Sequence, residues 1–140
     1  MIEISKFKTN DTALINKAYA IRNVVFVIEQ EVDEREEYDE FEDESIHFLV
    51  SIDNNPVATA RWRTTDNGIK LERFAVLKDY RGKGMGLKIL KAVISDLPKT
   101  EATVYLHAQV QVTGFYKKVG FNEIGDEFVE ANIRHYKMTL

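Results

Sequence analysis

Apolar and polar residues alternate along several short stretches of the chain, as they do in β-strands. The first eight residues show this alternation. Residues 46–52 and 57–63 are apolar runs separated by the turn sequence Asp53-Asn54-Asn55-Pro56, which predicts a β-hairpin. A second turn, which contains glycine, leads into a strand over 69–76. The first half of the chain is therefore expected to contain several strands joined by tight turns.

Two longer segments carry apolar residues at helical spacing. The first follows a potential cap at Asn10 or Asp11, and its β-branched and aromatic residues over 24–28 predict a break or kink near Phe26. The second spans about residues 84–97 and is closed by a proline. Its predicted central buried stripe consists of Leu87, Leu90, Ile94 and Leu97, and Ile89 and Val93 widen this stripe on one side.

The last 40 residues complete the pattern with short elements. A strand is expected over 103–108, a short helix over 112–119, and a closing antiparallel pair over 121–129 and 133–139. The predicted order is β-α-β-β-β-α-β-α-β-β, which places the chain in the α/β (α+β) class. At 140 residues, we expect one domain over 1–140 with a single core.

Composition narrows the classes of protein further. Without cysteine, the chain has no disulfide scaffold, no thiolate zinc site and no cysteine nucleophile. Three scattered histidines give no metal-ligand spacing, so no metal is expected. No apolar run is long enough to span a membrane, and the N-terminus lacks the apolar core of a signal peptide. We therefore expect a cytoplasmic protein without a membrane partner.

The net charge of −4 conceals an acidic segment over residues 33–44, which holds nine acids and one arginine. The remaining chain has 14 acids and 18 bases, so it is mildly basic. Such a charge run usually forms a solvated loop or helix face, and alternatively it attracts a cationic acceptor. An acidic protein without a basic aromatic stripe is not expected to bind nucleic acid.

Residues 72–87 carry the most informative pattern: an apolar strand, a loop rich in glycine and cations, and a helix start. The free N–H groups of a helix N-terminus bind phosphate, and glycines let the backbone approach it. Arg81 and Lys83 add charged donors. The glycines follow G-x-G-x-G, which fits neither the Rossmann spacing nor the Walker loop. The sequence predicts a pyrophosphate cradle of another kind.

Two motifs resemble those of the GNAT superfamily of N-acetyltransferases. Arg81-Gly82-Lys83-Gly84-Met85-Gly86 resembles its acyl-CoA signature, [QR]-x-x-G-x-[GA]. Leu106-His107-Ala108-Gln109, followed by Gly114 to Phe121, resembles its fifth strand and the "FYxxxGF" helix end. Residues 22–31, the acidic segment and His47 resemble the ElaA-like bacterial branch. The resemblance implies the GNAT fold, a mixed, mostly antiparallel sheet of six to seven strands flanked by helices, in which strands four (69–76) and five (103–108) splay apart.

The resemblance also implies a cofactor site for acetyl-CoA, used as a co-substrate. Strand four would offer its backbone at Phe74, Ala75 and Val76 to the pantetheine arm and the thioester. Gln109 stands where the family commonly has asparagine, which puts its contact with pantetheine in doubt. The other residues expected at the cofactor are Arg81, Gly82, Lys83, Gly84, Met85, Gly86 and Phe115.

Acetyl transfer also needs a proton donor for the thiolate and a base for the amine. Tyr116 stands at the family's tyrosine position and is the candidate general acid. Glu72 is the candidate base, with an ion pair to Arg61 or Arg73 as the alternative. His107 and His135 could also accept the proton. The expected substrate contacts are Glu29, Gln30, His107 and His135.

The sequence thus predicts an acetyl-CoA-dependent N-acetyltransferase that transfers the acetyl group directly to a primary amine of a small molecule or a protein. Two alternatives stay open. One is a non-catalytic CoA-binding sensor or regulatory module, and the other is an interaction domain that binds a basic partner through its acidic segment. A homodimer is also possible, since dimers are common in the family.

Overall fold

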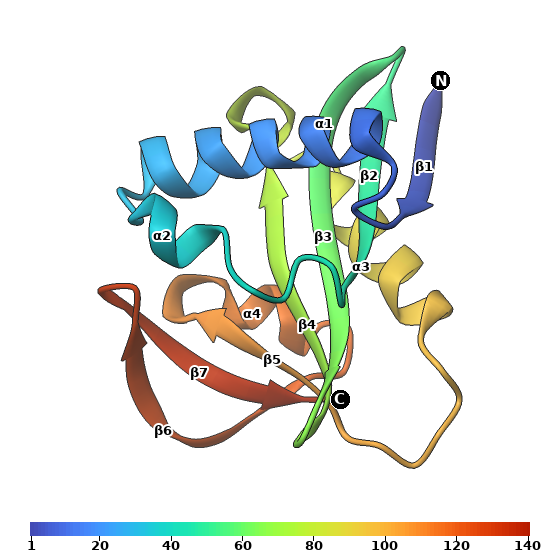
Figure 1. Ribbon diagram of the computed structural model, residues 1–140. Helices are drawn as coiled ribbons and strands as arrows, with labels where there is room; N and C mark the ends of the chain where they lie inside the picture. The colour runs from blue at the N-terminus through green and yellow to red at the C-terminus, as the bar shows by residue number, and fades with distance from the viewer.

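The protein, described here by a computed structural model of residues 1–140, is built around one seven-stranded sheet with the strand order β1-β2-β3-β4-β5-β7-β6 (Figure 1). The strands are β1 (Ile2–Phe7), β2 (Ile46–Ile52), β3 (Asn55–Thr65), β4 (Gly68–Val76), β5 (Val104–Gln109), β6 (Asn122–Glu130) and β7 (Ile133–Thr139). The α-helices are α1 (Thr12–Arg22), α2 (Glu34–Glu37), α3 (Met85–Asp96) and α4 (Thr113–Lys117). None of the helices is both long and apolar enough to cross a membrane.

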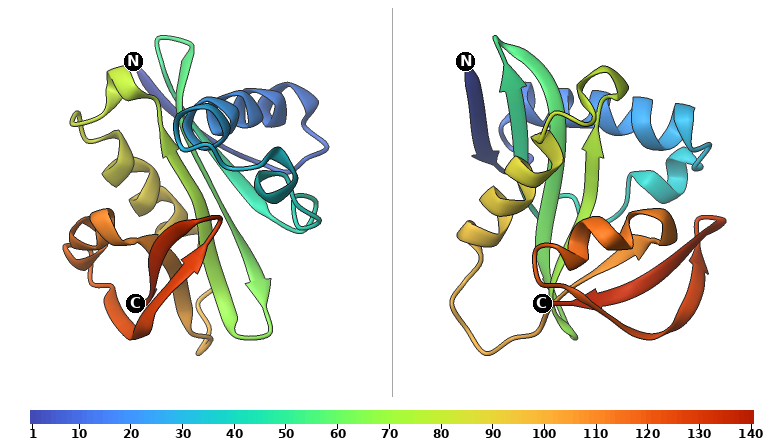
Figure 2. Two further views of the ribbon diagram at one scale, coloured as in Figure 1. Left: turned by 90° about the vertical axis from the view of Figure 1, so that its left-hand side faces the viewer. Right: turned by 180° about the vertical axis from the view of Figure 1, so that it is seen from behind.

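The pair β4–β5 is the only parallel pair in the sheet, and it is short. Its register joins residues 69–71 of β4 to residues 104–106 of β5, and beyond these residues the two strands are unpaired with each other. Strand β5 pairs with β7, and β7 pairs with β6. These three strands form the part of the sheet that turns away from β4 (Figure 2). The predicted α/β fold, with strands four and five splayed in a mixed sheet, is therefore confirmed.

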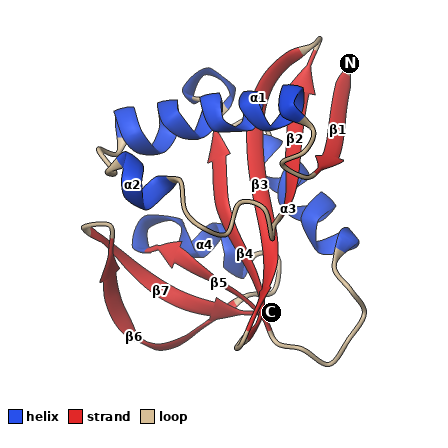
Figure 3. Cartoon of the chain, in the orientation of Figure 1, coloured by secondary structure: helices blue, strands red, loops and turns tan.

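Helices α1 and α3 cover opposite faces of the sheet (Figure 3). On α3, the buried residues are Met85, Ile89, Leu90 and Val93, so Leu90 is buried as predicted but the centre of the buried stripe is shifted towards its predicted flank. Leu87 is 37% exposed and borders a shallow depression beside Phe115 and Val119 of the α4 region. Apolar residues on both flanks of α3 made the two orientations hard to distinguish by spacing alone.

The first helix is capped as predicted, but it does not break at Phe26. The Asp11 side chain accepts a hydrogen bond from the Leu14 N–H at 3.2 Å. The α-helix ends at Arg22 and continues as a π-helical segment over Asn23–Glu29, so the change in helix type comes three residues earlier than the predicted kink. This wider segment contains the β-branched and aromatic residues that disfavour a regular α-helix.

The hairpin β2–β3 has a tighter turn than the sequence predicted. Its two turn residues, Asp53 and Asn54, have φ angles of 49° and 68°, as a type I′ turn requires. Strand β3 then begins at Asn55, and Pro56 lies beside a register shift in β2, where proline is tolerated in a sheet.

Candidate functional site

The divergence of β4 and β5 opens a cleft of about 860 Å³. Its walls come from both strands, the start of α3, α4, the π-helical segment, the region of α2 and the turn between β6 and β7. Segments far apart in the sequence therefore meet where the sheet splits (Figure 2). All of the site residues predicted from the sequence line this cleft except Glu29 and Lys83.

A β-bulge shapes the wall that β4 contributes. The register between β3 and β4 shifts at Thr59/Arg61, and Arg73 takes a left-handed φ of 61°. A bulge of this kind bends its strand and redirects the following residues. Residues 74–76 follow the bulge, lie beyond the last pair with β5, and line the cleft. Backbone groups on this edge of β4 are placed to pair with an extended ligand.

The glycine-rich loop lies at one end of the cleft, at the N-terminus of α3. Gly82 and Gly84 have left-handed φ angles of 74° and 83°, which glycine adopts without strain. A Cβ added at either position would meet nothing within 4 Å, so open space lies in front of the loop. Gly86 instead packs against the Phe115 ring, which would lie 3.5 Å from a Cβ added at this glycine. The open loop and the first turn of α3 fit a pyrophosphate group.

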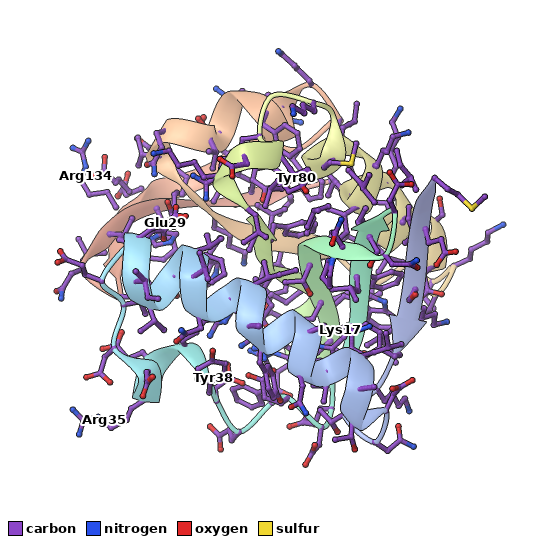
Figure 4. The ribbon with its side chains drawn as sticks, turned by 90° about the horizontal axis from the view of Figure 1, so that it is seen from above. Lys17, Glu29, Arg35, Tyr38, Tyr80 and Arg134 are labelled. Carbon is purple, nitrogen blue, oxygen red and sulfur yellow. The ribbon has the colours of Figure 1, made fainter.

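The structure places Arg81, Lys83 and Glu29 differently from the sequence expectation. Arg81 turns back from the loop, donating from Nε to the Val76 carbonyl and from one terminal nitrogen to Glu29, both at 2.8 Å. The Lys83 ammonium lies over the Tyr80 ring, 5.8 Å from its centroid. Glu29 lies at the end of the π-helical segment (Figure 4) and forms an ion pair with Arg81, and its contact with an acceptor stays a prediction.

Tyr116 on α4 lines the cleft next to Phe74 of β4. It is only 7% exposed and makes edge-to-face contacts with the rings of Phe74, Phe115 and Phe121. Burial raises the pKa of its phenol above the usual value of about 10. The hydroxyl group therefore stays protonated at neutral pH, as a proton donor must.

Two histidines on neighbouring strands line the other side of the cleft. The Nδ1 atom of His107 lies 3.2 Å from the Glu130 carboxylate, and that of His135 lies 2.7 Å from the Ile133 carbonyl. Both partners can only accept a hydrogen bond, so Nδ1 carries the proton in each ring and Nε2 of the neutral ring is an acceptor. The His107 contact lowers the pKa of Glu130 well below its usual value.

Glutamine side chains close the cleft between these histidines and the π-helical segment. The Gln109 amide donates to Gln30 at 2.8 Å and accepts from Gln111 at 2.7 Å. Gln30 therefore lies at the cleft as expected, and the side chain of Gln109 is occupied by protein contacts.

Glu72 is surrounded by cations. It accepts hydrogen bonds from Arg61 at 3.0 Å and from Arg63, and the Lys70 ammonium lies 3.5 Å away. Burial alone would raise the pKa of Glu72, but Arg61, Lys70 and Arg63 outweigh it and the pKa is lowered. These contacts match the ion-pair alternative with Arg61, and a carboxylate whose pKa is lowered is a weak base.

The acidic segment is not simply a solvated face. Glu37 and Glu42 are buried and pair with Arg22, and Glu42 and Asp39 pair with Arg61, each with a closest distance of 2.7 Å. Arg22 and Arg61 are 1% and 0% exposed, so they require these counter-charges. We call Arg22, Glu37, Asp39, Glu42, Arg61 and Glu72 the buried ion network.

Sequence reasoning included the ion pair of Arg61 with Glu72 but missed the pairing of Arg22 and Arg61 with the acidic segment, although one signal was present. Arg22 follows Ile15 and Ala18 at helical spacing, so it occupies the apolar stripe of α1. An arginine on a buried stripe needs carboxylates nearby, and the acidic segment is the obvious source. Arg63 and Lys70, which line the cleft on the same face as Glu72, were also missed.

Comparisons with known proteins agree with this architecture. Residues 17–140 match the family described as "Acetyltransferase (GNAT) domain". The Bacillus subtilis N-acetyltransferase YjcF is 41% identical over 126 residues, which cover 89% of this chain and 90% of YjcF. An acyl-CoA N-acyltransferase from Pseudomonas aeruginosa has a TM-score of 0.86 at 21% identity, and Escherichia coli ElaA has a TM-score of 0.82 at 24% identity, each match covering 99% of both chains. The chain belongs to the GNAT acetyltransferase family and is an N-acetyltransferase.

Proposed function

We propose that the protein transfers an acetyl group from acetyl-CoA to a primary amine by direct attack within a ternary complex. The observation that carries this proposal is the continuity of the cleft, which runs from the open glycine loop along the free edge of β4 to Tyr116 and the histidines. The similar Pseudomonas protein is named as an acyl-CoA N-acyltransferase, which supports the same donor class. A cytoplasmic location, a homodimer and a single domain over 1–140 stay predictions from the sequence.

In this proposal, Gly82, Gly84 and the first turn of α3 hold the pyrophosphate, while residues 74–76 pair with the pantetheine arm. Bound acetyl-CoA supplies the acetyl thioester. The amine nitrogen forms a bond to the thioester carbon as the carbon–sulfur bond breaks. Tyr116 gives its proton to the departing thiolate, and a base removes the proton that the amine loses.

His107 is our candidate for that base. Its Nδ1–H faces the Glu130 carboxylate, which fixes the tautomer and stabilises the imidazolium that forms when Nε2 takes up a proton. His107 follows Leu106, the last β5 residue paired with β4, so it lies where the two strands separate. Glu72 is less suited because its three cationic partners keep it ionised without a strong affinity for a proton.

We expect His107→Gln to lower kcat/KM about 100-fold at pH 7.5, at the lower end of the usual range for loss of a general base. An alkyl amine has a pKa of about 10.4, so more of it is already deprotonated as the pH rises. The deficit of the variant should therefore shrink towards pH 10. Steady-state rates across this pH range measure both effects. If His135→Gln shows the shrinking deficit and His107→Gln does not, the assignment moves to His135.

We expect Gly84→Asp to raise the KM for acetyl-CoA about 10- to 30-fold, because a carboxylate would enter the phosphate site. Repulsion between unit charges about 5 Å apart near a protein surface is on the order of 3 kcal/mol before salt screens it, and screening brings it down to the expected range. Gly84→Asn is the matched control, because asparagine tolerates the same left-handed backbone and has the same size without the charge. Equal KM values for the two variants would show that this loop does not form the phosphate site.

The proposed function is tested by calorimetric titration with acetyl-CoA, followed by assays of thiol release with a panel of primary amines. Binding together with amine-dependent thiol release is the expected result. Binding without release for any amine would favour the CoA-sensing alternative. Failure to bind acetyl-CoA would overturn the proposal.

A further inference from the structure

Arg63 has donors directed at the cleft that no protein group uses. Its Nε donates to Glu72, and its guanidinium stacks on the Phe41 ring, 3.8 Å from the centroid. The side chain is 12% exposed and lines the cleft. Its two terminal nitrogens make no hydrogen bond to the protein, and neither is sealed from solvent. Stacking on Phe41 and the bond to Glu72 therefore hold a free guanidinium edge in a fixed orientation.

Lys70 lies opposite Arg63 in the β3–β4 register and also lines the cleft. Its side chain is 13% exposed, and its only ionic partner is Glu72, at 3.5 Å. Arg61 has two further carboxylate partners, Asp39 and Glu42, whereas Arg63 and Lys70 have Glu72 alone. Glu72 is thus the one carboxylate in direct contact with both Arg63 and Lys70, so a second anion could contact the two cations directly.

We propose that the acceptor is an amine that also carries a carboxylate, and that Arg63 and Lys70 bind this carboxylate. This inference rests on the proposed acetyl transfer and names its acceptor class. The planar edge of a guanidinium binds a carboxylate through two parallel hydrogen bonds. A carboxylate brings one negative charge, so together with Glu72 it gives Arg63 and Lys70 one contacting anion each, whereas a phosphate monoester brings close to two charges at neutral pH.

The position of the pair relative to His107 suits a small amino acid. Lys70 and Glu72 are two residues apart on β4, which corresponds to about 7 Å along a strand. The pairing of Leu71 with Leu106 places Glu72 and His107 in the next row across the sheet. A carboxylate held at Lys70 would thus leave the amine of a short amino acid within reach of the His107 side chain.

The same observations argue against the cationic acceptor suggested by the acidic segment. Glu37, Asp39 and Glu42 are occupied by Arg22, Arg61 and Arg73, so they do not offer free negative charge to the cleft. Glu130 lines the cleft, but it accepts the Nδ1–H of His107. The side chains beside Glu72 that keep unused hydrogen-bond donors, Arg63 and Lys70, are therefore cationic.

The test compares matched acceptors that differ only in the carboxylate: glycine with glycinamide, β-alanine with β-alaninamide, and leucine with leucinamide. We expect at least one acid to exceed its amide in kcat/KM by tenfold or more. Titration of CoA-saturated protein with the N-acetylated acid and its amide measures the same preference by binding. Amides that react and bind as well as the acids would overturn the inference while the proposed acetyl transfer stands. If acetyl-CoA itself does not bind, both fail.

Two variants localise the preference. Arg63→Gln and Lys70→Gln should each raise the KM for the preferred acid about 10- to 30-fold, with little change for the amide or for acetyl-CoA binding. Arg63→Lys should restore part of the loss, because it returns the charge without the planar edge. Lys70→Gln makes the milder change, since its one ion pair is longer, and it serves if Arg63→Gln fails to fold.

Arg134→Gln is the control, because Arg134 lies on β7 outside the cleft lining (Figure 4). If both glutamine variants keep the full preference for the acid over the amide, these two side chains do not bind the carboxylate.

Discussion

Replacing Tyr116 by phenylalanine is expected to lower kcat about 100-fold or more, while acetyl-CoA affinity and stability change little. Loss of a positioned general acid commonly costs this much, because the thiolate must then leave without its proton. The ring contacts with Phe74, Phe115 and Phe121 survive in the variant. The phenol makes no hydrogen bond to the protein, so its removal leaves no buried partner unsatisfied. Single-turnover rates with saturating acetyl-CoA measure the effect.

Tyr136→Phe on β7 is the matched control, since Tyr136 lies outside the cleft lining and should leave kcat unchanged. The pH dependence gives a second check. Because burial raises the pKa of Tyr116, its protonated form persists above pH 10, so this group should not reduce wild-type activity at any lower pH. A wild-type kcat in Tyr116→Phe would make Tyr116 a packing residue only.

Much of the fold could be predicted because short elements with strong patterns dominate it. The strands over 46–52 and 69–76 are rich in apolar residues and are each next to a turn sequence, and both are found within a residue of their predicted limits. The strand order and the split between β4 and β5 depend on pairings between distant segments, which periodicity does not encode. For these, the two GNAT motifs were needed.

Prediction failed where tertiary contacts decide between similar local patterns. The sequence predicts Leu87 at the centre of the buried stripe of α3 and Ile89 at its flank, but docking against the sheet buries Ile89 and leaves Leu87 exposed. The sequence left Arg81 free to bind phosphate because its partners, Glu29 and the Val76 carbonyl, come from other elements. A charged residue in a motif can therefore orient the loop instead of contacting the ligand.

The acidic segment gives the clearest example, because local composition suggested solvent exposure while the fold required counter-charges. Three of its carboxylates pair with arginines from α1, β3 and β4, and the exposed remainder fits the expectation of a solvated face. The pairing also fixes the loop after α2, and with it Phe41, against the cleft. The ion pairs of the acidic segment thus determine the position of residues that line the cleft.

Arg61→Met is accordingly expected to lower the free energy of unfolding by about 3–5 kcal/mol, the usual cost of removing one partner from a buried ion pair. Methionine fills a similar volume, but Asp39, Glu42 and Glu72 would each lose a cation. Urea unfolding at pH 7 measures the change. Arg134→Met, at an exposed arginine paired only with Glu127, is the control and should stay within about 0.5 kcal/mol of the wild type.

Acid titration separates this electrostatic effect from a loss of packing. Burial would raise the pKa values of Asp39, Glu42 and Glu72, but their hydrogen bonds and charge pairs with arginine outweigh it and lower all three. Groups with lowered pKa values stabilise the fold above their ordinary values of about 4, and this stabilisation is lost as the pH falls through the lowered values. Wild-type stability should therefore decrease between about pH 5 and pH 3, and Arg61→Met, already lacking these interactions, should decrease less. Parallel curves for the two proteins would indicate that Arg61 contributes mainly through its packing.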